Sequence, residues 1–258
     1  MSEEIRTERR GSALWIRVDR PAARNAMTFA MYDRIAAICR HVNADTSVNA
    51  VVLTGSGDAF VAGTDIAEFV DFKEASQALD YERRMDAWLG AIEAVRVPTI
   101  AALRGPVVGG GLAIAAACDL RIAAPSARFG VPVARTLGNC FSAANLVRLA
   151  ALVGLGRVKE LVLTALLIDA HEARTIGLVS EIVANEDALD ARVDELVLQL
   201  ASYAPLTLHA TKEMVRRIRE RMMPDEASDL VALCYTSADF REGVTAFIER
   251  RKPVWSGR

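Results

Sequence analysis

Residues 99–123 read TIAALRGPVVGGGLAIAAACDLRIA, and this stretch decides the fold. Residues 99–103 and 119–123 are mostly apolar runs of strand length. Between them, residues 109–118 are small and apolar, which predicts a helix that begins near Gly109. The order strand, helix, strand is typical of a parallel pair, so we expect an α/β architecture with a covered, largely parallel sheet.

The same alternation continues on both sides of this stretch. Further strands are predicted at residues 13–18, 50–55 and 178–183, and further helices at residues 28–42 and 71–95. Thr28 is placed to cap the first of these helices.

After about Ser142 the character of the chain changes, because helical patterns follow one another. Pro205 and Pro224 separate the last three helical stretches. We therefore expect an α/β core at residues 1–200 and a helical C-terminal segment at residues 201–258. That segment carries apolar stripes, for example Val231, Cys234 and Tyr235, which a small tail would struggle to bury alone. Packing on another subunit is one reading of these stripes.

Composition narrows the function classes. The chain has 258 residues, is 52% hydrophobic and 25% charged, and has a net charge of -2. This balance gives no electrostatic reason to expect nucleic acid or an anionic membrane as a partner. The four cysteines and three histidines lack metal-site spacing, so no metal site is predicted. The N-terminus lacks an apolar segment and the longest apolar run is too short for a membrane, which makes a reducing, cytoplasmic location the default expectation.

Two glycine-bearing turns are the main candidate site. They are residues 60–66, FVAGTDI, and residues 106–112, PVVGGGL. The first amides of a helix have no intrahelical partner and lie at its positive end, so such turns favour an oxyanion or a phosphate. Taken singly, each has a structural explanation: tight helix–strand packing for the second turn, and an ordinary turn with Asp65 as a helix cap for the first.

With these motifs, the chain resembles the enoyl-CoA hydratase/isomerase family, also called the crotonase superfamily. The resemblance covers nearly the whole chain. Besides the two turns it includes RPAARNAM at 20–27, ARFGVP at 127–132, IDAHEARTIGLV at 168–179 and DFREGVTAFIERRKP at 239–253. It implies an α/β crotonase-like spiral of ββα units with a helical C-terminal region. It also implies an acyl-CoA substrate with no cofactor beyond the coenzyme A of the thioester, and a homotrimer or homohexamer.

The resemblance also implies roles for particular residues. The amides of Thr64 and Gly110 would hold the thioester oxygen as it becomes an enolate. The coenzyme A groove would be lined by Arg24, Ala26, Ala62, Asp65 and Ile66, and Phe247 and Arg250 would contact coenzyme A from a C-terminal helix. For Arg250, a solvated charge is the equal alternative.

Two departures bear on the reaction. Hydratases of this family carry a catalytic Glu where this chain has Ala113, and another where it has Val133. Neither side chain can transfer a proton, so the resemblance does not carry ordinary hydratase activity over. A lyase or isomerase of the same family remains, as does a catalytically silent acyl-CoA-binding or assembly protein. A hydrolase of the related protease fold would need an activated Ser, and no GxSxG-type elbow is present.

Substitute groups have to come from elsewhere in the chain. Asn139 and Cys140 lie in a stretch that the family places near the acyl group, where Asn139 could orient a water or a carbonyl. We read Cys140 as a buried inert thiol rather than a nucleophile. Glu68, Asp71 and Glu82 lie on a segment that often covers the acyl pocket in this family, so one of them could enter as a base. The alternative, which we expect for each, is the solvated surface, and we expect His171 there as well.

Overall fold

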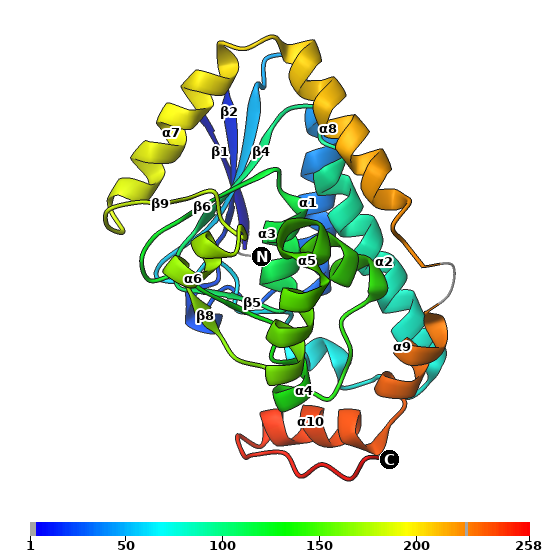
Figure 1. Ribbon diagram of the computed structural model, residues 1–258. Helices are drawn as coiled ribbons and strands as arrows, with labels where there is room; N and C mark the ends of the chain where they lie inside the picture. Colours follow the sequence, from blue (N-terminus) through cyan, green and yellow to red (C-terminus); the bar gives the residue numbers. More distant parts are fainter. Residues whose placement is uncertain (1–3, 225–226) are drawn as a thin grey trace.

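The main sheet has six strands. In the computed structural model, which describes residues 4–224 and 227–258, their order is β1-β2-β3-β4-β6-β9 (Figure 1). The strands are β1 (Ile5–Arg10), β2 (Ala13–Val18), β3 (Ala50–Gly55), β4 (Thr99–Leu103), β6 (Leu120–Ala123) and β9 (Glu181–Ile182). Only the β1–β2 pair is antiparallel, so the predicted, largely parallel sheet is confirmed.

Successive side chains of the central strands point to opposite faces of the sheet and pack into two separate hydrophobic cores. Val51 and Leu53 of β3 belong to the larger core, under the main group of helices. Val52 of β3 and Ile100 of β4 face the other way and pack in a smaller core with residues of α7 (Ala188–Ala201). Burial on both faces explains why these strands read as continuous apolar runs.

The helices that contribute to the larger core include α1 (Phe29–Val42), α2 (Ala75–Glu93), α3 (Gly110–Ala117) and α5 (Ala143–Thr164). The Thr28 hydroxyl accepts a hydrogen bond from the Met31 amide at 3.3 Å, which confirms the predicted cap. Helix α2 is shorter than predicted, because its regular backbone begins only at Ala75. Residues 66–69 before it form the short 3₁₀ helix η2 (Ile66–Phe69).

A second, three-stranded sheet was not predicted. It consists of β5 (Pro106–Val108), β7 (Arg128–Gly130) and β8 (Ile168–Asp169). These strands are too short to show a period in the sequence. Around them lie η1 (Pro21–Ala23), α4 (Val133–Thr136) and α6 (Ala170–Thr175). The strand predicted at residues 178–183 narrows to β9, which pairs with β6.

The C-terminal region comprises α8 (Pro205–Glu220), α9 (Ser228–Tyr235) and α10 (Ala238–Ile248). Val231 and Tyr235 of α9 are buried within the chain and Cys234 is half-buried. Burial of Val231 and Tyr235 does not require another subunit, since α9 packs along α2. Helix α10 packs against η2 at the lower end of the molecule (Figure 1). No helix among the described residues is long and apolar enough to cross a membrane.

Candidate active site

The two glycine turns lie side by side. Val61 of the first turn and Val107 of β5 form a parallel bridge, with the Val108 amide donating to the Val61 carbonyl at 3.1 Å. A Cβ on Gly111 would lie 2.1 Å from that carbonyl oxygen, so only glycine permits this approach. A Cβ on Gly110 would lie 3.5 Å from the Thr64 nitrogen. The backbones at Thr64 and Gly110 are therefore neighbours, although 46 positions separate them in the chain.

Both amides are free to bind a ligand. Within the described residues, neither the Thr64 N–H nor the Gly110 N–H donates a hydrogen bond to a protein group. Gly110 is the first residue of α3, so the helix itself offers its amide no partner. The preceding residue, Gly109, has φ 52° and turns the chain from β5 into the helix. The Gly110 amide at the N-terminus of α3 and the neighbouring Thr64 amide together form a site that favours negative charge.

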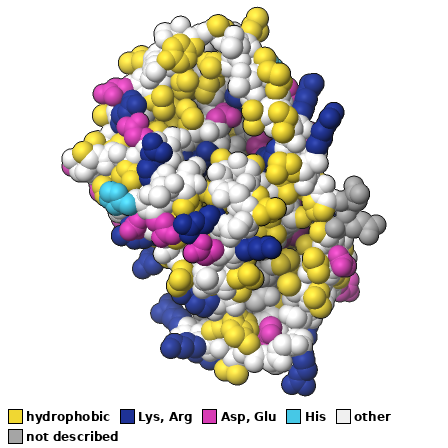
Figure 2. Space-filling model, viewed as in Figure 1, with side chains coloured by type: hydrophobic (Ala, Val, Ile, Leu, Met, Phe, Trp, Pro, Cys, Tyr) yellow, Lys and Arg dark blue, Asp and Glu magenta, His cyan; other side chains and the backbone are white. Residues whose placement is uncertain are grey.

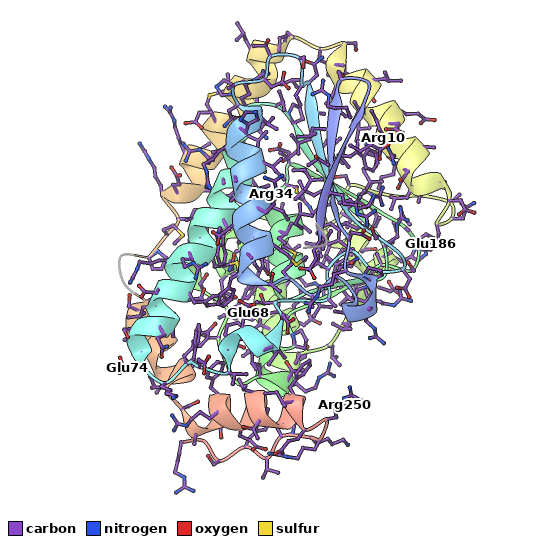
Figure 3. The ribbon with its side chains drawn as sticks, turned by 180° about the vertical axis from the view of Figure 1, so that it is seen from behind. Arg10, Arg34, Glu68, Glu74, Glu186 and Arg250 are labelled. Carbon is purple, nitrogen blue, oxygen red and sulfur yellow. The ribbon has the colours of Figure 1, made fainter. Side chains whose placement is uncertain are left out.

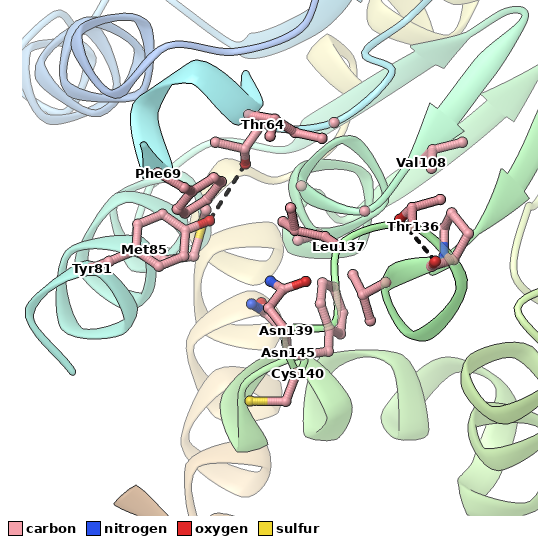
Figure 4. Close-up of a pocket in the computed structure, with 18 of the residues that line it drawn as sticks. Thr64, Phe69, Tyr81, Met85, Val108, Thr136, Leu137, Asn139, Cys140 and Asn145 are labelled. Carbon is pink, nitrogen blue, oxygen red and sulfur yellow. Dashed lines mark hydrogen bonds between the residues drawn. The ribbon is translucent and has the colours of Figure 1, made fainter. Parts of the chain in front are cut away.

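The Thr64 side chain is anchored away from its amide. Its Oγ1 lies 3.0 Å from the Tyr32 hydroxyl and 3.4 Å from the Tyr81 hydroxyl, and Figure 4 shows the second contact. Tyr32 and Tyr81 come from α1 and α2, so both helices hold the first turn in place. The sequence did not single out these tyrosines, because their partner lies in a turn far along the chain.

A pocket of about 670 Å³ of space free of protein atoms opens beside the two amides. Thr64 and Gly110 line it, as do Ala113 and Val133, so the two positions that carry acids in hydratases face the same space as methyl and isopropyl groups. Figure 4 shows Thr64, Tyr81 and Met85 along one side and Asn139 and Cys140 across from them. Most of the wall is apolar, which suits the acyl part of a ligand.

Glu82 corrects the prediction of a solvated side chain. It lies on α2, is 8% exposed and lines the pocket. Its sequence position contained the signal: Ala78 and Met85, four residues before it and three after, are both buried on the apolar face of α2. Burial raises the pKa of Glu82 to about 7, with the hydrogen bond from Tyr235 acting in the opposite direction.

Three polar groups form a chain along the pocket wall. The Asn139 amide nitrogen donates to the Tyr235 hydroxyl at 3.0 Å, and that hydroxyl donates to Glu82 Oε1 at 2.8 Å. Asn139 Oδ1 is buried and has no hydrogen-bond partner within the described residues. The prediction placed Asn139 near the acyl group, and it does line the pocket, whereas the role of Tyr235 was missed.

The other proposed substitutes do not reach the pocket as reactive groups. Burial raises the pKa of the Cys140 thiol, so it stays protonated, as expected for an inert thiol. Glu68 is half-buried and accepts a hydrogen bond from the Phe29 amide at 3.3 Å. Asp71 and His171 are exposed, as predicted.

The residues predicted for coenzyme A divide into two groups. Ala62 and Ile66 line the pocket, and the exposed Arg24 lies beside it, because its carbonyl accepts from the Ala62 amide at 3.1 Å. Asp65 has a structural role, since it caps η2 and pairs with Arg20 at 2.6 Å.

The other residues predicted to contact coenzyme A lie outside the pocket wall. The half-buried Ala26 lies close to Arg20, which donates to its carbonyl at 3.0 Å. Phe247, on α10, is 55% exposed, and Arg250 follows the end of that helix, also exposed (Figure 3). Neither Phe247 nor Arg250 lines the pocket in the described chain, so their contact with coenzyme A stays a prediction.

Comparison with known proteins adds to this geometry. A family model described as enoyl-CoA hydratase/isomerase matches residues 8–258. A crotonyl-CoA hydratase of Syntrophomonas wolfei is 37% identical, over 97% of this chain and 96% of that protein. A 2,3-dehydroadipyl-CoA hydratase of Escherichia coli is 32% identical, over 100% of both chains.

Solved structures show the same similarity in three dimensions. An enoyl-CoA hydratase/isomerase from Pseudoalteromonas atlantica superposes with a TM-score of 0.85 at 29% identity, over 98% of this chain and 100% of that one. A methylmalonyl-CoA decarboxylase in complex with 2-nitronate-propionyl-CoA superposes with a TM-score of 0.88 at 24% identity, over 98% of each chain. At that identity the second likeness concerns the fold alone.

Proposed function

Because this chain belongs to the enoyl-CoA hydratase/isomerase family, we propose that it binds acyl-CoA thioesters and stabilises their enolates with the amides of Thr64 and Gly110. The observation that carries the proposal is the convergence at one pocket of two N–H groups that the described chain leaves free. A thioester oxygen gains negative charge as its enolate forms, so fixed donors stabilise the transition state more than the ground state.

Coenzyme A would lie along the first turn. Arg24 supports this placement, because its exposed guanidinium has the planar donor geometry that suits phosphate and its backbone bonds to Ala62 in the pocket wall. Ala26, Asp65 and Ile66 would supply backbone and apolar contacts. Phe247 and Arg250 would contact coenzyme A from α10, which packs against η2.

We propose that the reaction is not the usual hydration, which a pair of glutamates catalyses. Relatives named as hydratases support an enoyl-CoA substrate. The apolar side chains of Ala113 and Val133 in the pocket wall argue against the usual acid pair. The same two residues favour the second candidate, a catalytically silent acyl-CoA-binding protein. Tight binding of crotonyl-CoA by calorimetry without turnover of any enoyl, hydroxyacyl or haloacyl thioester would favour that second candidate.

The amide assignment is tested at Gly110. Proline there removes the N–H and is tolerated at the first position of a helix. Any side chain at this position would also meet the Tyr32 hydroxyl at 2.2 Å, so both Gly110→Pro and its control Gly110→Ala are made in a Tyr32→Phe background. The measurement is exchange of the α-protons of butyryl-CoA in D₂O, followed by NMR, because exchange reports enolate formation whatever reaction follows.

Proline should slow exchange by about 10²–10³-fold relative to alanine, the typical effect of one lost donor. Equal exchange rates in the two folded variants would show that the Gly110 amide does not hold the oxyanion.

The homotrimer or homohexamer is also a proposal. It is supported by α8, in which no residue is buried within the described chain although Leu206 and Ile218 are large and apolar. A reducing, cytoplasmic location stays a prediction.

A further inference from the structure

Glu82 and the two free amides share one cavity. Among the described residues that line the pocket, Glu82 is the only one with a carboxyl group. It comes from α2, whereas Gly110 comes from the start of α3 and Thr64 from the turn before η2. A substrate whose carbonyl oxygen reached the amides would therefore occupy the space onto which the Glu82 side chain opens.

The carboxyl is held in a way that a purely structural acid would not require. Within the described residues, Glu82 forms no ion pair with an Arg or Lys, and its hydrogen-bond donors are neutral hydroxyls: Tyr235, at 2.8 Å, and Ser142. Burying a carboxyl without a cation costs stability, and such groups cluster at functional sites. With burial raising its pKa to about 7, Glu82 can both accept and release a proton near neutral pH.

We infer that Glu82 is the group that takes a proton from the acyl chain of the bound thioester and returns it, acting from the α2 wall in place of the side chains that positions 113 and 133 lack. This inference rests on the proposed function, because it needs the enolate that the two amides stabilise. It assigns to α2 a catalytic residue that the family motifs do not contain.

The step is balanced without any further reactant. The Glu82 carboxylate takes the proton from the carbon beside the thioester carbonyl, so that a C–H bond breaks and an O–H bond forms. The electron pair forms the enolate double bond, and the charge moves to the thioester oxygen between the Thr64 and Gly110 amides. The proton then returns to the same carbon or, in an unsaturated chain, to the carbon two positions further along. One carboxyl can therefore move a double bond, with no water added.

Tyr235 acts as a positioning residue. Burial raises its pKa well above its ordinary value, so its hydroxyl keeps the proton that it donates to Glu82. Asn139 fixes the orientation of that hydroxyl through its amide nitrogen, while its Oδ1 is buried and has no partner in the described chain. Asn139 thus helps to hold the tyrosine that donates to Glu82.

The pH dependence of proton exchange is set by Glu82 together with the titratable groups that surround it. The titratable groups around Glu82 are Tyr81 and Asp86 on α2, Tyr32 on α1, Cys140 in the loop before α5, and Tyr235 on α9. Burial raises the pKa values of Tyr81 and Cys140 above their ordinary values, so both stay neutral. Asp86 pairs with Arg148 at 3.1 Å, and its charge raises the pKa of Glu82.

The test uses Glu82→Gln, which keeps the size of the side chain and can still accept from Tyr235. The matched control is Asp80→Asn, which removes a carboxylate from the exposed side of the same helix. Binding of butyryl-CoA is measured by calorimetry, and exchange of its α-protons in D₂O by NMR. Glu82→Gln should bind within about threefold of the wild type and exchange at least about 100-fold more slowly, the low end for loss of an acid–base group.

Each other outcome has a definite meaning. Wild-type exchange that survives Glu82→Gln overturns the inference and leaves the amide proposal standing. Binding without exchange in the wild type also overturns it, while the acyl-CoA site remains. Absence of binding in the wild type overturns the proposed function itself.

A second variant keeps the inference falsifiable if Glu82→Gln folds poorly. Tyr235→Phe removes a hydrogen bond that lowers the pKa of Glu82, so the carboxylate should form only at higher pH. The exchange rate of the wild type should rise with pH through an inflection near 7, and in Tyr235→Phe this inflection should move upward. A lower rate with an unmoved inflection would show that exchange does not follow the protonation of Glu82, and would overturn both the positioning role and the inference.

Discussion

Single side chains distinguish this pocket from that of a hydratase. Ala113 and Val133 present hydrocarbon to the space in front of the two amides, and the carboxyl enters from another helix, at Glu82. A buried acid without a cation is more stable in its protonated form. Burial of Glu82 should therefore lower the free energy of unfolding when the carboxyl ionises, an effect that can be measured without any activity assay.

Glu82 should therefore make stability depend on pH. Below about pH 4.5 the carboxyl is protonated in both the folded and the unfolded chain. Between that value and about 7 the unfolded chain loses the proton while the folded chain keeps it, so the free energy of unfolding falls as pH rises. Relative to the wild type, Glu82→Gln should gain about 3 kcal/mol in free energy of unfolding between pH 4 and pH 8.

Urea unfolding of both proteins at matched concentration measures this difference, with Asp80→Asn as the control for loss of a carboxylate on α2. Parallel stability curves for the wild type and Glu82→Gln would mean that Glu82 is not buried as an acid.

Among the elements, α10 supports the pocket from outside. Gly243 of α10 lies against the loop that carries Leu137 and Asn139, and both of these residues line the pocket. A Cβ on Gly243 would lie 2.2 Å from the Leu137 carbonyl oxygen, a backbone atom that cannot rotate away. The helix therefore sits as close to the pocket loop as the backbone allows.

Gly243→Ala should separate α10 from this loop and lower the free energy of unfolding by about 1–3 kcal/mol, as is typical of overpacking. Gly90→Ala is the matched control, because Gly90 lies within α2 with nothing within 4 Å of its Cβ position, and alanine there should be neutral or stabilising. The urea midpoints of the two variants provide the comparison. If both variants unfold at the same midpoint, the contact between α10 and the loop is loose.

For the whole molecule, α8 offers an apolar surface that nothing in the described chain covers. Leu206 and Ile218 are 80% and 66% exposed, and Val215 between them is 60% exposed. Figure 2 shows hydrophobic side chains gathered at the upper end of the molecule, where α7 and α8 lie in Figure 1. An amphipathic helix with no buried residue in the described chain is typical of a subunit interface.

The wild type should therefore have a solution mass of three or six times that of the chain by light scattering. Val215→Lys with Ile218→Lys should shift the mass toward the monomer, because two charges would be buried without partners. Ser76→Lys with Ala87→Lys adds the same charge to exposed positions of α2 and should leave the mass unchanged. A monomeric wild type would contradict the proposal.

Local patterns were enough to predict much of this protein. Alternating strands and helices, the Thr28 cap and the order of the family motifs determined the largely parallel sheet and the crotonase-like fold, which the structural neighbours confirm. The glycine turns were found because the positive φ at Gly109 and the close backbone approach at Gly111 need glycine, which the sequence shows directly. The division at residue 200 stays a prediction.

Only the tertiary structure determined where the Glu82 carboxyl lies and how the C-terminal helices pack. Glu82, Tyr235 and Asn139 meet although α2, α9 and the loop before α5 are far apart in the chain, and Val231 is buried within the chain, where α9 packs along α2. The physical reason is that burial and pKa depend on which distant elements pack together. The two turns could be read as one site from their residues. The spacing of Glu82 from Ala78 and Met85 pointed to its burial, but its contact with Tyr235 depends on the packing of other helices.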